Sequence, residues 1–283
     1  MRYGICILPD QPWSAARPLW QRAEEMGFHH AWTYDHMVWG GLPDSQWFSC
    51  VPTLTAAAAV TSRIKLGPYV TSPNFRHPAA FSREVQTLTD ISDGRLMVGL
   101  GVGGTPDDKI LGQPKLAVRQ RVDRYQEFVE VLDRTLSEDH VSIDGTYFRT
   151  DDMRLVGGSV RARVPLLLAG NGPRSVRFAA RHGDGWITTG SPSETVDDWF
   201  DAVARSVDVL REARAGDDAP FDTYLSLDAS PRNALESVGF FDALVGRATE
   251  LGFSDVVVHW PRKTEPYRAP LAVLEQIASR GLR

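Results

Sequence analysis

The sequence has little cysteine, no concentrated positive charge and no long apolar run. Its two cysteines, Cys6 and Cys50, lack metal-ligand spacing, which excludes a disulfide framework and predicts two buried free thiols. The net charge of −5 argues against nucleic acid, whose phosphates require a concentrated positive face. We expect no secretory leader, and no stretch approaches the roughly 18 apolar residues of a membrane span. We therefore expect a cytoplasmic protein with neither nucleic acid nor a membrane as partner.

The signatures of several enzyme classes are also missing. Gly-x-Ser-x-Gly, His-Glu-x-x-His, Cys-x-x-Cys and the Walker phosphate loop do not occur. Hydrolase, metalloprotease and nucleotide triphosphatase activities therefore lack support, and no metal site is predicted.

Short apolar runs alternate with segments of helical spacing along the chain. Several runs are continuously apolar, which is typical of parallel strands buried on both faces. Eight strand-helix units predict an α/β fold of the (β/α)8 TIM-barrel type, with an open doubly wound sheet as the alternative. The expected strands are 3–8, 31–34, 64–71, 96–100, 164–169, 186–188, 224–228 and 256–259. The expected helices are 13–26, 53–62, 79–91, 119–136, 174–181, 196–214, 241–251 and 270–280.

Insertions interrupt this alternation. We assign residues 1–283 to one barrel domain, with insertions at the barrel mouth near 38–51 and 104–118. A third segment, 140–158, is predicted to form a small hairpin that turns at Asp144-Gly145 into Tyr147-Phe148.

Chemically versatile residues follow the predicted strands, where barrels of this type bind their ligands. Asp35 and His36 follow the second strand and offer a carboxylate and an imidazole, or alternatively form a solvated turn. The glycine-rich segment 170–175 leads into a helix with Pro173 near its first turn, which indicates either an anion site or a structural helix start. His259 closes the eighth strand and points to the same mouth. Few catalytic side chains accompany these loops, so a cofactor is expected to supply the chemistry.

Two longer stretches carry a resemblance to a known family. The run Thr87-Leu88-Thr89-Asp90-Ile91-Ser92-Asp93-Gly94-Arg95 with Gly99-Leu100-Gly101, and Gly170-Asn171-Gly172-Pro173 with Ala179-Ala180-Arg181-His182-Gly183-Asp184-Gly185-Trp186, resemble the bacterial luciferase-like monooxygenases. The resemblance spans most of the chain. It implies a barrel that binds FMN or the deazaflavin coenzyme F420 at its mouth, and family members are often dimers, so a homodimer is a further expectation.

The resemblance also implies which residues contact the cofactor. The phosphate region would be held by Gly170, Asn171, Gly172, Pro173, Arg174 and Ser175, directly after Ala169. The ring or ribityl chain would be flanked by Gly101, Val102, Gly103 and Gly104. Thr71 and Ser72 match the place where the family often has a non-proline cis peptide against the ring.

Asp35-His36 followed by Trp39 is similar to the deazaflavin-dependent branch of the family. The similarity implies that Asp35 anchors the ring, His36 stabilises developing charge or exchanges a proton, and Trp39 excludes water. The implied reaction is hydride transfer between coenzyme F420 and a small organic substrate, because deazaflavin transfers hydride and reacts poorly with oxygen.

One departure bears on the substrate. Some deazaflavin dehydrogenases have an acidic glutamate after the glycines that correspond to Gly103 and Gly104, but Thr105 stands there, with Asp107 and Asp108 further on. A sugar-phosphate substrate is therefore in doubt. Aromatic residues of the mouth favour an apolar or ring-shaped substrate instead, namely Trp13, Trp39, Trp47 and Phe48.

Three other functions stay open at this point. The first is an FMN-dependent monooxygenase that uses oxygen and receives reduced flavin from a separate cofactor reductase. The second is a flavin-binding relative without catalysis. The third is a flavin-free barrel enzyme whose 170–175 segment holds a substrate phosphate.

Overall fold

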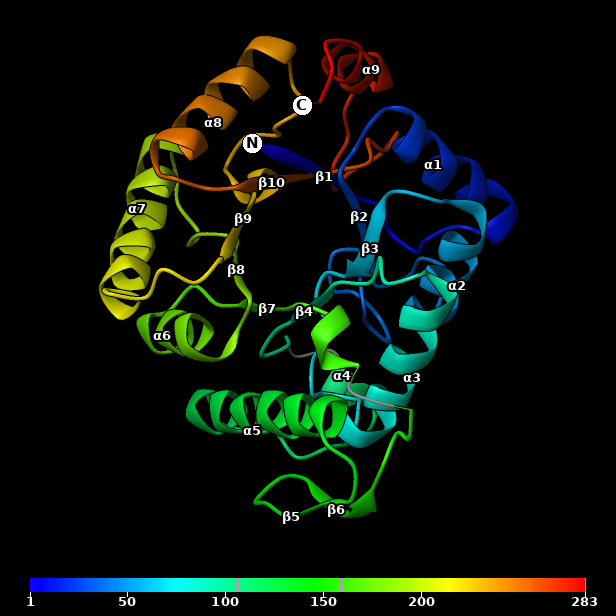
Figure 1. Ribbon diagram of the computed structural model, residues 1–283. Helices are drawn as coiled ribbons and strands as arrows, with labels where there is room; N and C mark the ends of the chain where they lie inside the picture. Colours follow the sequence, from blue (N-terminus) through cyan, green and yellow to red (C-terminus); the bar gives the residue numbers. More distant parts are fainter. Residues whose placement is uncertain (105–106, 158–159, 283) are drawn as a thin grey trace.

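A parallel sheet surrounded by helices forms the centre of the molecule (Figure 1). The computed structural model describes residues 1–104, 107–157 and 160–282. Within these residues the eight-stranded sheet has the order β3-β2-β1-β10-β9-β8-β7-β4. Its strands are β1 (Arg2–Cys6), β2 (His30–Thr33), β3 (Lys65–Pro68), β4 (Val98–Leu100), β7 (Leu166–Ala169), β8 (Gly185–Thr188), β9 (Asp222–Ser226) and β10 (Asp255–His259).

The sheet closes on itself between β3 and β4. Parallel bridges join Leu66 to Leu96 and Thr71 to Leu100. The Thr71 amide donates to the Gly99 carbonyl, and the Gly101 amide donates to the Thr71 carbonyl, both at 2.8 Å. The predicted (β/α)8 barrel is therefore confirmed, and the open doubly wound alternative is wrong.

Helices cover the outside of the barrel (Figure 1). They are α1 (Trp13–Glu25), α2 (Cys50–Val60), α3 (Pro78–Ile91), α4 (Asp107–Ile110), α5 (Val118–Ser137), α6 (Pro173–His182), α7 (Val196–Ala213), α8 (Val238–Glu250) and α9 (Leu271–Ser279). In α3, Pro78 occupies the first turn, and the buried residues Phe81, Val85 and Leu88 share one face at helical spacing. The short helix α4 was not expected and lies in the 104–118 insertion.

The 140–158 segment forms the expected hairpin from β5 (Val141–Asp144) and β6 (Arg149–Met153). Its second strand begins later than predicted, because the Glu127 carboxylate of α5 accepts the amide protons of Tyr147 and Phe148 at 2.8 and 2.7 Å. These amides are therefore unavailable to the hairpin ladder.

Some expectations fall on residues outside the described parts. These are residues 105–106 of the 104–118 insertion, Thr105 included, and residue 158 at the end of the hairpin segment. The assignment of 1–283 to one domain stays a prediction.

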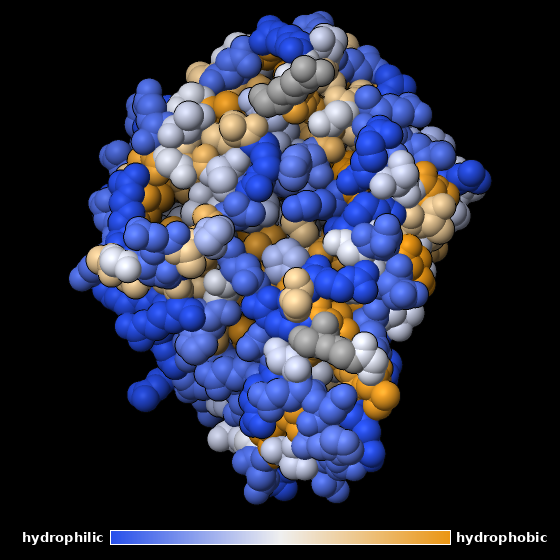
Figure 2. All heavy atoms as spheres, viewed as in Figure 1, coloured by the Kyte–Doolittle hydropathy of each residue, from blue (hydrophilic) through white to orange (hydrophobic). Residues whose placement is uncertain are grey.

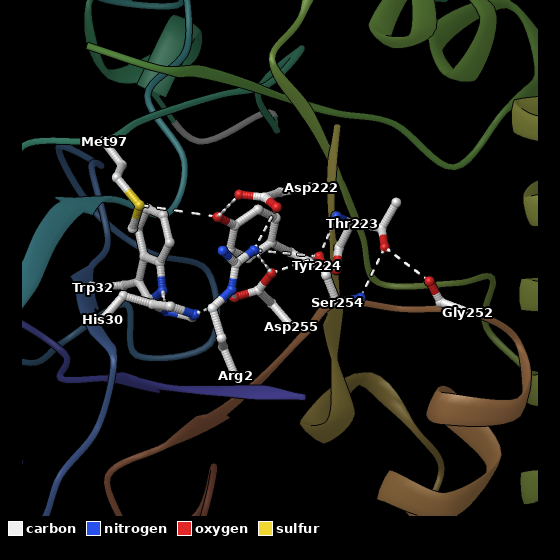
Figure 3. Close-up of polar contacts among 10 residues, drawn as sticks. All are labelled: Arg2, His30, Trp32, Met97, Asp222, Thr223, Tyr224, Gly252, Ser254 and Asp255. Carbon is white, nitrogen blue, oxygen red and sulfur yellow. Dashed lines mark hydrogen bonds and ion pairs between the residues drawn. The ribbon is translucent and has the colours of Figure 1, made fainter. Parts of the chain in front are cut away.

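A polar cluster fills the barrel at the amino ends of its strands (Figure 3). Asp255 accepts from Arg2 Nε at 2.8 Å and from His30 Nε2 at 3.0 Å. Trp32 Nε1 donates to His30 Nδ1 at 2.6 Å, and the Tyr224 ring packs edge-on against His30. Burial raises the pKa of Asp255, but the hydrogen bonds from His30 and Arg2 outweigh it and hold this pKa below its usual value. We refer to Arg2, His30, Trp32, Tyr224 and Asp255 as the N-terminal cluster.

Both cysteines are buried and free, as the sequence predicts. Burial raises the pKa of each thiol well above its ordinary value, so both stay protonated and unreactive at neutral pH. Across the described residues, we find no helix with the length and apolar character that crossing a bilayer requires. The face shown in Figure 2 is mostly hydrophilic, with hydrophobic residues in small separate patches.

Candidate functional site

A cavity of about 490 Å³ lies at the carboxyl ends of the strands. This volume lies in the range typical of small-molecule and cofactor sites. Its walls come from the segments that follow β2, β3, β4, β7, β8 and β9 and from the loop before α9. The lining residues are Tyr34, His36, Trp39, Tyr69, Val70, Gly101, Val102, Gly103, Gly104, Ala169, Gly170, Asn171, Ser175, Ile187, Thr189, Ser226, Asp228, Ala229 and Tyr267.

Backbone without side chains forms part of this lining. Gly103 has φ +81°, and a Cβ there would lie 2.5 Å from Asn74 Nδ2. A Cβ on Gly170 would lie 2.5 Å from the Cβ of Ser175. Both positions therefore require glycine, and they leave main chain open to a ligand.

A buried network supports the loop after β4. Asn74 Nδ2 donates to the Gly104 carbonyl at 2.5 Å, and Arg124 Nη2 of α5 donates to Asn74 Oδ1 at 2.7 Å. Arg124 also pairs with Asp108 at 3.1 Å. Through these contacts, Asn74 and Arg124 tie the glycine loop to α5 and hold its position.

His36 is held by a carboxylate from α4. Its Nδ1 donates to Asp107 Oδ2 at 2.8 Å, while the other oxygen of Asp107 accepts the Met37 amide at 2.8 Å. Asp107 is fully buried, and His36 lines the cavity. With Nδ1 engaged, Nε2 of His36 is the ring nitrogen left to meet a ligand.

Asp35 lies behind the cavity wall and is not among its lining residues. Its carboxylate accepts from Arg76 at 2.6 and 2.9 Å and from the Thr71 hydroxyl at 2.7 Å. Thr71 and Ser72 are both buried. The non-proline cis peptide lies between Tyr69 and Val70, directly before Thr71, and both of its residues line the cavity.

The 170–175 segment makes the turn from β7 into α6. The Asn171 side chain bridges to the end of β8, donating to Thr189 Oγ1 at 2.8 Å and accepting from Thr188 Oγ1 at 2.9 Å. Pro173 is the first residue of α6, and the amides that follow it point toward the helix N-terminus, where anions are favoured. Arg174 instead reaches α5 and pairs with Asp123 at 2.5 Å.

Tyr34, Trp39 and Tyr267 line another part of the cavity and, with His259 behind them, form what we call the aromatic wall. The rings of His259 and Tyr267 stack at 3.6 Å, and Trp39 lies parallel to Tyr267 at 5.9 Å. Tyr34 Oη contacts His259 Nε2 at 2.8 Å and Tyr267 Oη at 3.0 Å. Asp228 Oδ2 accepts from His259 Nδ1 at 3.0 Å.

Several large apolar side chains near the mouth are exposed to solvent. Met37 precedes the 38–51 insertion and Phe48 lies in it, while Ile110, Leu111 and Val118 lie in the 104–118 insertion. None of the lining residues that the structure describes is a lysine or an arginine.

The structure thus brings many of the predicted site residues around one cavity: His36, Trp39, Gly101, Val102, Gly103, Gly104, Ala169, Gly170, Asn171 and Ser175. It places Asp35, Thr71, Ser72, Gly172, Pro173 and Arg174 outside the lining. Sequence reasoning missed Tyr34, Asp228 and Tyr267 as site residues. Asp228 closes a predicted strand, which was a usable signal, whereas nothing in the sequence marks Tyr267.

The barrel and its mouth define the class of the protein, and comparison gives the family. Residues 1–236 match the model of the luciferase-like monooxygenase family, so the chain belongs to this family. The resemblance to its F420-dependent branch is confirmed by the relatives described next.

Two relatives and one solved structure illustrate the similarity. The F420-dependent hydroxymycolic acid dehydrogenase of Mycobacterium tuberculosis is 34% identical over 59% of this chain, and the match spans 46% of that protein, about half its length. The F420-dependent glucose-6-phosphate dehydrogenase of Intrasporangium calvum is 31% identical over 79% of this chain and 68% of that protein. The structure of an F420-dependent secondary alcohol dehydrogenase in complex with an F420-acetone adduct has a TM-score of 0.79 at 17% identity, covering 98% of this chain and 97% of that one, and shows the shared fold.

Proposed function

We propose that the protein is a coenzyme F420-dependent oxidoreductase that transfers hydride between the cofactor and a small, neutral, largely apolar substrate. The observation that carries this proposal is that one cavity is lined by the glycine loops, by the aromatic wall and by His36, whose Nδ1 is held by Asp107. The F420-dependent relatives support the choice of cofactor.

The cavity fits such a cofactor. A planar ring requires close approach to the main chain, which Gly103 and Gly170 provide because a side chain at either position would collide with its neighbours. An anionic tail requires backbone N–H groups, which the N-terminus of α6 provides after Gly172. When bound, deazaflavin supplies a carbon centre that accepts or donates a hydride.

The protein's own part is to bind, orient and protect. His36 would hold or deliver a proton at Nε2, because Asp107 fixes its Nδ1. Trp39 would exclude water from the reacting atoms, since it stacks in the aromatic wall. Asp35 would act through Arg76 and Thr71 to hold the loop after β3 rather than by touching the ring.

The lining also limits the substrate. A phosphorylated sugar would need positive charge beside it, and the described lining contains neither lysine nor arginine. The apolar and aromatic side chains of the lining, such as Trp39, Val70 and Ile187, favour an apolar molecule instead. A cytoplasmic location, a homodimer and a separate cofactor reductase stay predictions.

Titration of the purified protein with F420 and, separately, with FMN tests the proposal. Tryptophan quenching serves as the signal, because Trp39 lines the cavity. Micromolar or tighter binding of F420 with weak FMN binding is expected. A preference for FMN, with oxygen consumed in step with substrate, would replace the proposal by the two-component monooxygenase. Binding of neither cofactor would overturn it.

A further inference from the structure

The aromatic wall contains a hydrogen-bonded chain that the proposed hydride transfer does not itself require. It runs from Tyr267 through Tyr34 and His259 to Asp228. His259 is almost completely buried, whereas Tyr34, Tyr267 and Asp228 line the cavity. A proton can therefore reach His259 from the cavity through the two phenols.

The direction of each hydrogen bond follows from the atoms involved. Asp228 Oδ2 accepts the backbone N–H of His259 at 2.6 Å and the Nδ1–H of the same residue at 3.0 Å. In neutral His259 this leaves Nε2 as an acceptor for the single Tyr34 proton. Tyr34 Oη must then accept from Tyr267, so the free lone pairs of Tyr267 Oη are available to accept a proton from a ligand.

Protonation of His259 reverses the direction of each hydrogen bond in the chain. Nε2 then donates to Tyr34, Tyr34 donates to Tyr267, and the free end at Tyr267 becomes a donor. The chain with neutral His259 can accept the hydroxyl proton of an alcohol. The chain with protonated His259 can donate a proton to the oxygen of the corresponding carbonyl compound. Asp228 stabilises the charged imidazole in the second state.

Resting on the proposed function, we infer that Tyr267, Tyr34 and His259 form a proton relay for an alcohol–carbonyl substrate at this wall. During oxidation, hydride leaves the alcohol carbon for oxidised deazaflavin while the O–H proton passes to Tyr267 Oη. The Tyr267 proton passes to Tyr34, and the Tyr34 proton passes to His259 Nε2. The C–O single bond becomes C=O, and reduction reverses every transfer.

The surroundings of the chain favour phenols that keep their protons between transfers. Burial raises the pKa of Tyr34 well above its ordinary value and raises that of Tyr267 to about 12. Stacking between His259 and Tyr267 fixes both rings. Arg262 pairs with Asp10 at 3.0 Å and donates to the carbonyls of Glu265 and Pro266, which holds the loop that carries Tyr267.

The test compares Tyr34→Phe and Tyr267→Phe with Tyr147→Phe, a matched control on the hairpin turn. Isopropanol, cyclohexanol and benzyl alcohol serve as substrates, and reduction of F420 is followed by its absorbance. We expect both relay variants to lose about a hundredfold or more in kcat. The F420 Kd should stay within about twofold, because the glycine loops and the N-terminus of α6, rather than these hydroxyls, are proposed to hold the cofactor. The control should match the wild type.

Turnover in mixtures of light and heavy water separates a relay from a structural role. In the wild type, the plot of kcat against the fraction of heavy water should be curved, because several protons move in the same step. The plot should become linear in Tyr34→Phe. Wild-type kcat and an unchanged plot in Tyr34→Phe would overturn the relay. Wild-type protein that binds F420 but turns over none of the three alcohols, and none of the matching carbonyls in reverse, would overturn it as well. Failure to bind F420 would overturn the proposed function itself.

Discussion

The His30–Asp255 and His259–Asp228 pairs lie at opposite ends of the barrel and have different third partners. In the N-terminal cluster, His30 pairs with Asp255 and accepts a hydrogen bond from the indole N–H of Trp32. At the mouth, His259 pairs with Asp228 and meets the phenol of Tyr34. An indole N–H only donates, whereas a phenol both donates and accepts. The first arrangement can therefore hold only one proton distribution, and the second can exchange protons.

Charge balance separates the two ends further. Arg2 neutralises Asp255 through a hydrogen bond of 2.8 Å, and His30 is fully buried. Asp228 lines the cavity, and the described lining has no lysine or arginine beside it. We conclude that the N-terminal cluster stabilises the barrel, while the pair at the mouth is placed for chemistry.

The largest effect is expected for a substitution that disrupts the N-terminal cluster. Asp255→Asn removes the charge that partners Arg2 and His30, so the free energy of unfolding should fall by about 3 kcal/mol or more. Equilibrium denaturation in urea measures this value. The variant should bind F420 as the wild type does, and an unfolding free energy unchanged from the wild type would contradict a structural role for the cluster.

The matched substitution at the mouth is expected to act on turnover. Asp228→Asn cannot stabilise protonated His259, so kcat with F420 should fall by about a hundredfold, or about 2.7 kcal/mol. Stopped-flow or steady-state reduction of F420 measures the loss. Its unfolding free energy should change much less than that of Asp255→Asn, and the opposite ranking of the two variants would refute the comparison.

A smaller effect is expected at the glycine turn before α6. Gly170→Ala places a Cβ 2.5 Å from that of Ser175, which must shift the turn that faces the cavity. The F420 Kd should rise about tenfold, equal to about 1.4 kcal/mol. Gly239→Ala is the control, because its Cβ would have no neighbour within 4 Å. Equal F420 affinity in the two variants would remove this turn from the binding site.

The smallest effect is a pH dependence at the N-terminal cluster. Burial lowers the pKa of His30 below its ordinary 6.5, outweighing the opposing hydrogen bond to Asp255, and the charge of Arg2 also lowers it. As pH falls below 6.5, the unfolded chain gains this proton first, so stability declines with acid and is flat above that pH for this group. The slope from one group is at most about 1.4 kcal/mol per pH unit. Urea denaturation at several pH values from 5 to 7 measures how the free energy of unfolding changes with pH. This slope should be shallower in His30→Gln, and an unchanged slope would show that other groups cause the pH dependence.

Sequence patterns predicted the barrel well because burial imposes strong constraints on parallel strands. The alternation of apolar runs and amphipathic segments located each barrel strand and most helices, with differences of a few residues at their ends. The hairpin strand was placed too early, because the carboxylate of Glu127, which is distant in sequence, captures the amides of Tyr147 and Phe148. Short helix α4 carries little apolar periodicity and was missed.

The site was predictable where it follows strand ends and hidden where it depends on distant partners. His36 and the glycine loops follow predicted strands and line the cavity. Asp107 pairs with His36 across 71 residues, and Tyr267 reaches Tyr34 across 233, so no local pattern indicates either contact. Asp35 follows a strand end as a site residue would. Its carboxylate instead binds Arg76, 41 residues away, and does not line the cavity.

Hydrogen–deuterium exchange with and without F420 tests most directly which end of the barrel is functional. We expect F420 to slow exchange in 101–104 and 170–175, the two glycine segments that contribute to the cavity lining, and to leave the amides around Arg2 and Asp255 unchanged. Protection confined to the N-terminal cluster, or no protection at the mouth when F420 is saturating, would contradict the assignment of the mouth as the cofactor site.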